Sequence, residues 1–199
     1  MKYLMLDIET VPLDIEHEDV KKYLMDKKIG ESRKLNPSYA KIILICIKFL
    51  NGDFKIFEGN EKELLTNFWD FMKNNKDVKI ITHNGYGFDI PFLTIRSCVN
   101  NIDIPVKINM NRWGMENSNH FDTMLFFSSQ GQFTNPNLDI LAKLNGIEVE
   151  GEFIDGRDIE KLYKKGNSEK IKEHCKRDIE VLEKVFEKLC FGYLNKNRF

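Results

Sequence analysis

Acidic residues interrupt apolar or turn-forming segments at three places in this 199-residue chain. Asp7 and Glu9 lie in the apolar run at residues 3–10, Asp89 follows a turn that contains two glycines, and Asp178 lies in a late amphipathic segment. An unpaired buried carboxylate is costly, and neighbouring carboxylates repel each other unless a positive charge lies between them. Hard divalent cations bind oxygen ligands. We therefore expect the four acids to form a metal site suited to phosphodiester hydrolysis.

The first acid pair lies in a continuous apolar run that is typical of a strand covered on both faces. Because side chains alternate between the two faces of a strand, Asp7 and Glu9 point the same way. The alternative is a strand whose end reaches solvent, since an Asp-X-Glu triplet is common by chance. The pair alone does not decide between these interpretations.

A second short apolar run, at residues 78–82, leads into the turn that ends at Asp89. Two glycines supply the backbone freedom that a tight turn needs, and Pro91 then begins an apolar helix. For this turn taken alone the structural interpretation is favoured, with Asp89 as a helix cap and Asn84 as a turn former.

The third segment, residues 168–189, has the apolar periodicity of a helix. Its apolar stripe consists of Ile171, Cys175, Leu182, Val185 and Leu189. Asp178 fills the gap in that stripe, where a purely structural helix would carry an apolar residue. His174 lies one turn earlier and neighbours Asp178. The alternatives are a salt bridge from Asp178 to a nearby Lys or Arg, and an exposed surface imidazole for His174.

The remaining pattern predicts a single α/β domain over residues 1–199, with a mixed central sheet flanked by helices. Strands at 41–50 and 54–57, joined through Asn51-Gly52, should pair antiparallel with the first strand. A helix should carry Leu64, Leu65, Phe68 and Met72, and another should begin at Asn135-Pro136-Asn137 and end at Gly146.

A polar, basic insertion at about residues 11–40 separates the first two strands. Its basic residues are Lys21, Lys22, Lys27, Lys28, Arg33 and Lys34. Charged runs are usually solvated, so the plain interpretation is a helix and loop on the surface. The functional alternative is a basic flap over a nucleic-acid strand.

Composition excludes some classes of protein. The chain is 42% hydrophobic and contains no apolar run near ~20 residues, which argues against a membrane span. Asp7 and Glu9 interrupt the only apolar N-terminal stretch, which argues against a signal peptide. Four cysteines without paired short spacing argue against zinc and for a reducing cytoplasm. The formal net charge of -1 is weak evidence against nucleic-acid binding, because binding depends on local lysines.

Three segments resemble the motifs of the DEDD superfamily of 3′-5′ exonucleases, which have a ribonuclease H-like fold. The segments are Asp7-Ile8-Glu9-Thr10, Asn84-Gly85-Tyr86-Gly87-Phe88-Asp89 and His174-Cys175-Lys176-Arg177-Asp178. The chain is most similar to the predicted exonucleases related to the proofreading domain of family B DNA polymerases. Connecting stretches agree with this resemblance, at residues 37–43, 120–124 and 154–158.

The resemblance implies two divalent ions, Mg²⁺ or Mn²⁺, held by the four acids. Asp7 would bridge both ions, Glu9 and Asp178 would complete the first, and Asp89 would lie at the outer position. It also implies that Thr10, Asn84 and Phe88 bind the substrate near its 3′ end. The expected substrate is single-stranded nucleic acid, DNA in preference to RNA, with a polymerase or a replication or repair protein as a candidate partner.

The third motif departs from the family pattern. The family usually has Tyr four residues before the Asp of this motif, and the other DEDD branch has His five residues before it; here His174 stands four residues before Asp178. We expect His174 to take part directly in proton transfer, and a merely positioning role is the alternative. The alternatives for the whole protein are an exoribonuclease and a nucleic-acid-binding module of the same fold without turnover.

Overall fold

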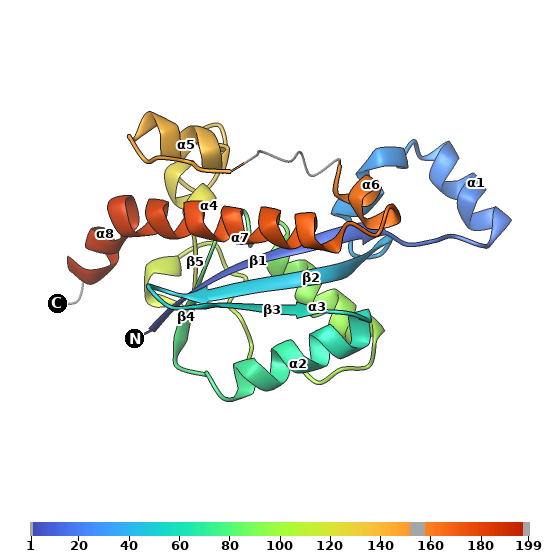
Figure 1. Cartoon of the computed structure of the whole chain (residues 1–199), viewed down its shortest axis with the longest axis horizontal. Helices are drawn as coiled ribbons and strands as arrows, with labels where there is room; N and C mark the ends of the chain where they lie inside the picture. Colours follow the sequence, from blue (N-terminus) through green and yellow to red (C-terminus); the bar gives the residue numbers. More distant parts are fainter. Residues whose placement is uncertain (1, 152–157, 197–199) are drawn as a thin grey trace.

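A computed structural model describes residues 2–151 and 158–196. A five-stranded sheet in the order β3-β2-β1-β4-β5 lies between helices (Figure 1). The strands are β1 (Lys2–Pro12), β2 (Ala40–Phe49), β3 (Phe54–Glu58), β4 (Val78–Thr82) and β5 (His120–Asp122). β1 is antiparallel to β2 and parallel to β4, so the sheet is mixed, as the sequence predicts.

Helices of very different length connect and cover the strands. They are α1 (Glu18–Asp26), α2 (Glu61–Lys73), α3 (Asp89–Val99), α4 (Thr123–Phe127), α5 (Leu138–Leu144), α6 (Ile159–Lys164), α7 (Ser168–Val185) and α8 (Phe191–Lys196). Short 3₁₀ segments η1 (Gly30–Leu35) and η2 (Met115–Asn117) lie in loops, and a π-helical segment η3 (Phe186–Cys190) joins α7 to α8. No helix in the described ranges is both long and apolar enough to cross a membrane.

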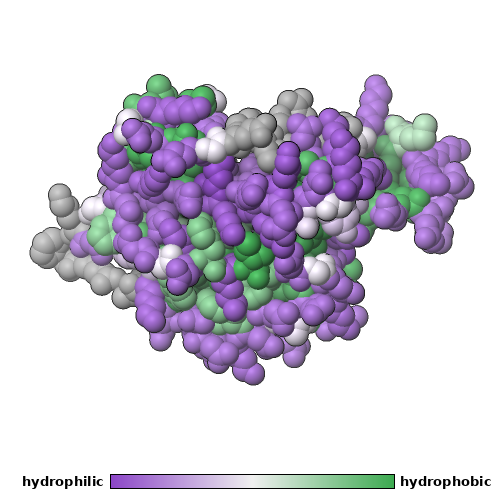
Figure 2. Space-filling model, viewed as in Figure 1, coloured by the Kyte–Doolittle hydropathy of each residue, from purple (hydrophilic) through white to green (hydrophobic). Residues whose placement is uncertain are grey.

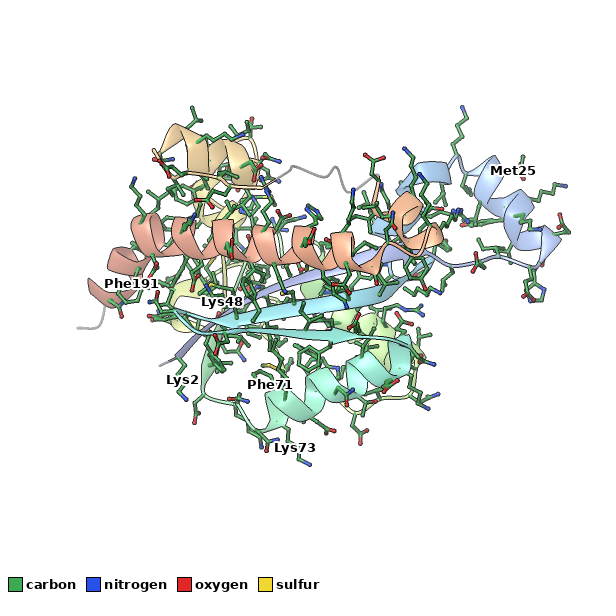
Figure 3. The ribbon with its side chains drawn as sticks, viewed as in Figure 1. Lys2, Met25, Lys48, Phe71, Lys73 and Phe191 are labelled. Carbon is green, nitrogen blue, oxygen red and sulfur yellow. The ribbon has the colours of Figure 1, made fainter. Side chains whose placement is uncertain are left out.

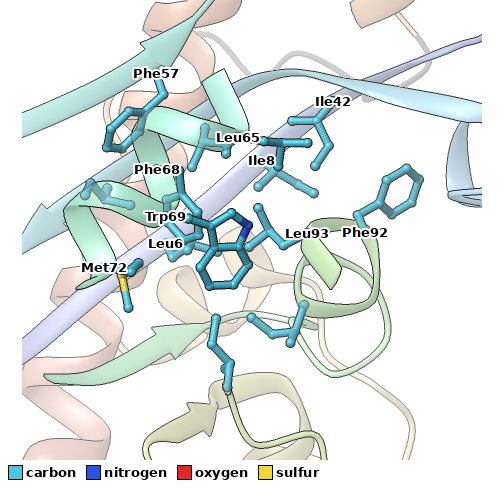
Figure 4. Packing of buried hydrophobic residues seen from close by; sticks show 14 of the residues in the cluster. Leu6, Ile8, Ile42, Phe57, Leu65, Phe68, Trp69, Met72, Phe92 and Leu93 are labelled. Carbon is cyan, nitrogen blue, oxygen red and sulfur yellow. The ribbon is translucent and has the colours of Figure 1, made fainter. Parts of the chain in front are cut away.

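The two faces of β1 belong to different cores. Leu6 and Ile8 pack with α2 and α3 (Figure 4). Between these two helices the Trp69 indole donates a hydrogen bond to Ser97 Oγ at 2.7 Å. Alternate residues of the strand pack under α7 on the other face, namely Tyr3, Met5 and Val11. Since β1 is buried on both faces, any polar side chain along it must find a partner inside the protein.

A β-bulge bends the sheet beside the first acid pair. Glu9 pairs with Leu44, but Thr10 pairs with Ile42, so Ile43 is an extra residue in β2. Ile43 and Leu44 consequently both join the core under α7. The extra residue lies in β2, so the alternation of side chains along β1 continues unbroken past Glu9.

Several predicted elements are confirmed. β1, β2 and β3 form the expected antiparallel group, α7 begins at Ser168, and Asn137 caps α5 by accepting hydrogen bonds from two backbone N–H groups. Gly146 follows α5 with a left-handed φ of 64°. β1 continues to Pro12 and β2 begins at Ala40, so the insertion occupies residues 13–39.

Two local predictions were wrong. Asp89 is the first residue of α3, and the helix neither begins at Pro91 nor uses Asp89 as its cap, because Phe88 occupies the N-cap position. The apolar stripe of α7 also has no gap, since the fully buried Ile179 continues it between Cys175 and Leu182. Asp178 therefore lies beside this stripe, at the edge of the buried face.

The turn between β4 and α3 is tightly packed at Gly85. A Cβ atom there would lie 2.2–2.7 Å from three side-chain atoms of Thr82 at the end of β4. Such distances are far inside van der Waals contact, and β-branched Thr82 is fully buried and cannot rotate away freely. Gly85 therefore allows the turn to fold back against its own strand.

We predict that Gly85→Ala destabilises the protein by roughly 1–3 kcal/mol, the usual cost of overpacking. Urea unfolding of the two proteins measures the difference. Gly192→Ala is the control for crowding, because nothing lies within 4 Å of its Cβ position; it should leave the free energy of unfolding unchanged or raise it, since Gly192 lies in α8 and alanine has the higher helix propensity. Equal stability of Gly85→Ala and the parent would show that the turn is not held as described.

Candidate active site

The acids of β1 meet α7 because the strand and the helix run antiparallel across the sheet face. Cys175 Sγ lies 3.1 Å from Asp7 Oδ2, and His174 Nε2 lies 3.6 Å from Glu9 Oε1. The same His174 nitrogen lies 3.6 Å from Asp178 Oδ2, one helical turn further on. Asp7 and Glu9, which share one face of β1, thus meet adjacent residues of α7, and residues up to 168 positions apart in sequence form one cluster.

Burial and mutual repulsion raise the pKa values of these acids. Burial, and secondly the charge of Asp178, raises the pKa of Asp7 to about 7. The pKa of Glu9 is raised well above its usual value by burial and then by the charges of Asp7, Asp178 and Asp89. The pKa of Asp89 is likewise raised well above its usual value, first by burial and then by the charge of Asp7. Each of the four predicted acids is therefore linked by its charge to at least one of the others.

The donor atoms fit a divalent cation. Asp89 Oδ1 is buried without a hydrogen-bond partner in the described part of the chain, as expected of a carboxylate oxygen that a cation would satisfy. Among the described residues, Asp7, Glu9 and Cys175 place ligand atoms within 4.8 Å of one another, while Asp89 and Asp178 lie outside this tight group. Carboxylate oxygens suit Mg²⁺ or Mn²⁺.

Cys175 is a neighbour of the acids that the sequence pattern had assigned only to the core. Burial raises the pKa of its thiol well above the usual value, so the group stays protonated and donates its hydrogen bond to Asp7. The second carboxylate oxygen of Asp7 remains available to a ligand. Cys175 therefore orients Asp7 as well as filling the core.

A cleft of about 430 Å³ opens beside the cluster. Asp7 and Asp178 line it together with Asn84, His83 and the segment 135–138. His83 ties two of these walls together, since its ring nitrogens lie 2.9 Å from Thr123 Oγ1 and 2.9 Å from the Pro136 carbonyl oxygen. The acid cluster is thus accessible from a cleft large enough for part of a nucleotide.

Asp122 holds the turn that carries Asn84. Its carboxylate accepts hydrogen bonds from the backbone N–H groups of Asn84 and Tyr86, each at 3.0 Å, and also from that of Leu125. Asn84 adopts a left-handed φ of 74°, which Asn tolerates better than most residues. The fully buried Asp122 therefore fixes the conformation that turns Asn84 toward the cleft.

The three residues expected to bind substrate occupy different surroundings. Asn84 lines the cleft, whereas Phe88 and Thr10 are not among the residues that line it. The Phe88 ring packs against Phe92, with centroids 4.7 Å apart. The Thr10 hydroxyl donates to the Lys34 carbonyl oxygen at 2.8 Å, so it anchors the basic insertion. The roles of Phe88 and Thr10 toward substrate stay predictions.

His174 is buried, so its interpretation as an exposed surface imidazole is wrong. Burial lowers its pKa, although the charge of Asp178 acts in the opposite direction. Its Nε2 lies between Glu9 and Asp178, and its Nδ1 has no hydrogen-bond partner within the described residues. The imidazole is therefore in place to contact either acid or a group bound between them.

Arg177 was missed by the sequence reasoning. Its guanidinium forms a two-pronged ion pair with Asp139 at 2.5 and 3.1 Å and also donates to Asp178 Oδ1 at 2.8 Å. The salt bridge considered as the alternative for Asp178 thus exists, beside the acid cluster. Arg177 holds one oxygen of Asp178, while Oδ2 faces His174. The sequence offers no signal for the distant partner, Asp139 on α5.

Comparisons with known proteins agree with the fold. The family described as predicted 3′-5′ exonucleases related to the exonuclease domain of PolB matches residues 36–186, a range that includes Asp89, His174 and Asp178 but not Asp7 and Glu9. An uncharacterised protein of Methanocaldococcus jannaschii is 30% identical over 159 residues, 75% of this chain and 86% of its own length.

Among solved structures, the family B DNA polymerase from the hyperthermophilic archaeon Pyrobaculum calidifontis is similar to this chain with a TM-score of 0.70 and 18% identity. The similarity covers 97% of this chain but 25% of the polymerase. It confirms the ribonuclease H-like α/β fold expected from the sequence.

The pKa of Asp7 predicts how the metal-free protein responds to pH. Between the usual value of 3.8 and about 7, folded Asp7 keeps a proton that the unfolded chain releases, so raising the pH favours unfolding. The free energy of unfolding should fall across this window, and Asp7→Asn should reduce the fall. Thermal denaturation at a series of pH values measures both.

Divalent ions should reverse this loss, because they bind the ionised acids of the folded state only. Millimolar Mn²⁺ should raise the melting temperature of the parent, more at neutral than at acidic pH, and raise that of Asp7→Asn less. The same Mn²⁺ response in both proteins would argue against the assigned site.

Proposed function

This chain belongs to the family of predicted 3′-5′ exonucleases related to the exonuclease domain of PolB, and from that membership we propose that it removes nucleotides from the 3′ end of single-stranded DNA. The observation that carries the proposal is the cluster of buried and half-buried, mutually repelling acids beside an open cleft. Perturbed acids in a cleft are typical of catalytic sites. The polymerase similarity favours DNA over RNA.

Two divalent ions held by Asp7, Glu9, Asp89 and Asp178 would supply an activated water and stabilise the leaving oxygen. The protein's own contribution is to hold the acids in place. Cys175 orients Asp7, and Arg177 fixes one oxygen of Asp178.

The substrate would enter through the cleft that Asn84 lines. Asn84 would bind the strand near its 3′ end, and the backbone of its turn is held by Asp122. We assign His174 to the attacking water, because its imidazole lies between Glu9 and Asp178 and can accept or orient a proton there. Thr10 and Phe88, which do not line the cleft, are proposed to contact the strand outside it, near its 3′ end.

Digestion of 5′-labelled oligonucleotides tests the activity. With Mn²⁺ or Mg²⁺ the parent should shorten single-stranded DNA stepwise from its 3′ end, and a chelator should stop it. Asp178→Asn should reduce the rate by at least about 10²-fold, because a charged group that stabilises the reacting centre is lost. A folded Asp178→Asn with parental activity would contradict the proposed site.

Matched RNA and DNA substrates distinguish the remaining alternatives, since the 2′ hydroxyl is the feature that such a site must read. Faster digestion of RNA would make the protein an exoribonuclease. Binding of either oligonucleotide without metal-dependent cleavage would make it a nucleic-acid-binding module.

His174→Ala should lower turnover by roughly 10²–10⁴, the usual range for general acid-base groups, while the stabilisation by Mn²⁺ persists. His174→Tyr is the informative comparison, because it restores the residue that the family usually carries. Single-turnover rates of the three proteins measure the effect. A Tyr variant as fast as the parent would reduce His174 to a positioning residue.

A further inference from the structure

A second cavity, of about 670 Å³, lies beyond the acid cluster, at the end of β1. Its walls come from β1, β2, the insertion at residues 13–39 and α6, and Figure 1 shows the insertion and α6 at the same end of the molecule. Four basic and two acidic side chains line it, namely Lys21, Arg33, Lys41, Lys164, Asp14 and Glu160. The lining is therefore positive, in contrast to the acid cluster.

Lys41 lines this cavity and lies close to the acid cluster along the sheet. It pairs in register with Val11, which lies two residues beyond Glu9 on β1. Because alternate residues of a strand share a face, Asp7, Glu9 and Val11 lie on the face covered by α7, and Lys41 lies beside Val11 on that face. At about 3.3 Å per residue, Val11 is only roughly 7 Å along the strand from Glu9.

Two cations that line the cavity, Lys41 and Arg33, are half-buried. Neither Lys41 nor Arg33 forms an ion pair with any residue that the structure describes, whereas Lys21 and Lys164 each pair with a glutamate at 2.6 Å. Lys41 Nζ lies 5.5 Å from the centre of the Tyr163 ring instead. Partly desolvated cations without a counter-ion are unfavourable, so a bound anion would be stabilised here.

We propose that this cavity binds a backbone phosphate of the nucleic-acid strand, within about two nucleotides of the bond that is cleaved, with Lys41 and Arg33 as the contacts. The proposal rests on the proposed function, because the acid cluster fixes where the reacting phosphate lies. It assigns the basic insertion a part in substrate binding, through Arg33. The anchor of the insertion, the Thr10 hydroxyl on the Lys34 carbonyl, lies next to Glu9 and places Arg33 at the cavity.

Binding of single-stranded DNA by the cleavage-deficient Asp178→Asn protein tests this assignment. Lys41→Gln and Arg33→Gln, each added to that protein, should weaken binding and reduce the slope of log affinity against log salt by about 0.7 each. Lys41→Arg should restore the slope. Lys73→Gln is the control, since Lys73 lies on α2 across the sheet from α6 (Figure 3), and it should bind as the parent does.

Oligonucleotides with one neutral methylphosphonate linkage at successive positions locate the contact. In the Asp178→Asn protein one linkage near the 3′ end should cost affinity, and adding Lys41→Gln should abolish the cost at that linkage alone. Parental salt slopes in both Gln variants, or an unchanged linkage profile, would overturn the phosphate site. If the parent cleaves DNA under those results, only this inference fails; if the wild-type protein neither binds nor cleaves, both proposals fail.

Discussion

The packing of β1 against α7 brings like charges together inside the protein. Asp7 and Glu9 project from a strand that is buried on both faces, and Asp178 approaches them from the helix above. Burial of the ionised acids, and then their mutual repulsion, opposes folding, and the raised pKa values of Asp7 and Glu9 express that cost. A divalent cation would offset this cost, so the contact that strains the metal-free protein is also where we propose that the metal binds.

The surrounding polar groups hold these acids in place without neutralising them all. Cys175 donates one hydrogen bond to Asp7, and Arg177 shares its charge between Asp178 and Asp139. Asp122 holds the turn beside the cleft in the same way, through backbone N–H groups. The face of the molecule seen in Figure 2 is largely hydrophilic, and apolar side chains are exposed on it at the end formed by α1. Rigid support around an unneutralised centre is typical of a preorganised metal site.

The sequence predicts the parts of this arrangement that local pattern determines. The period of two in β1 places Asp7 and Glu9 on one face, and the helical period places His174 beside Asp178. Ile179 also fits the helical period, four residues after Cys175 and three before Leu182, so the sequence is compatible with a continuous stripe as well as with one interrupted at Asp178. Other features depend on how distant segments approach each other.

Two such features lie in the candidate site. Arg177 forms an ion pair with Asp139, 38 residues away in sequence, and the Thr10 hydroxyl donates to the Lys34 carbonyl oxygen in the insertion. Neither contact follows from a local pattern.

Anomalous diffraction from crystals soaked in Mn²⁺ is the most direct measurement of the site itself. We expect density at coordination distance from Asp7, within reach of Glu9 or Asp178, and its loss in Asp7→Asn. Manganese bound elsewhere in the parent, or bound unchanged in Asp7→Asn, would contradict a metal site at the β1–α7 contact.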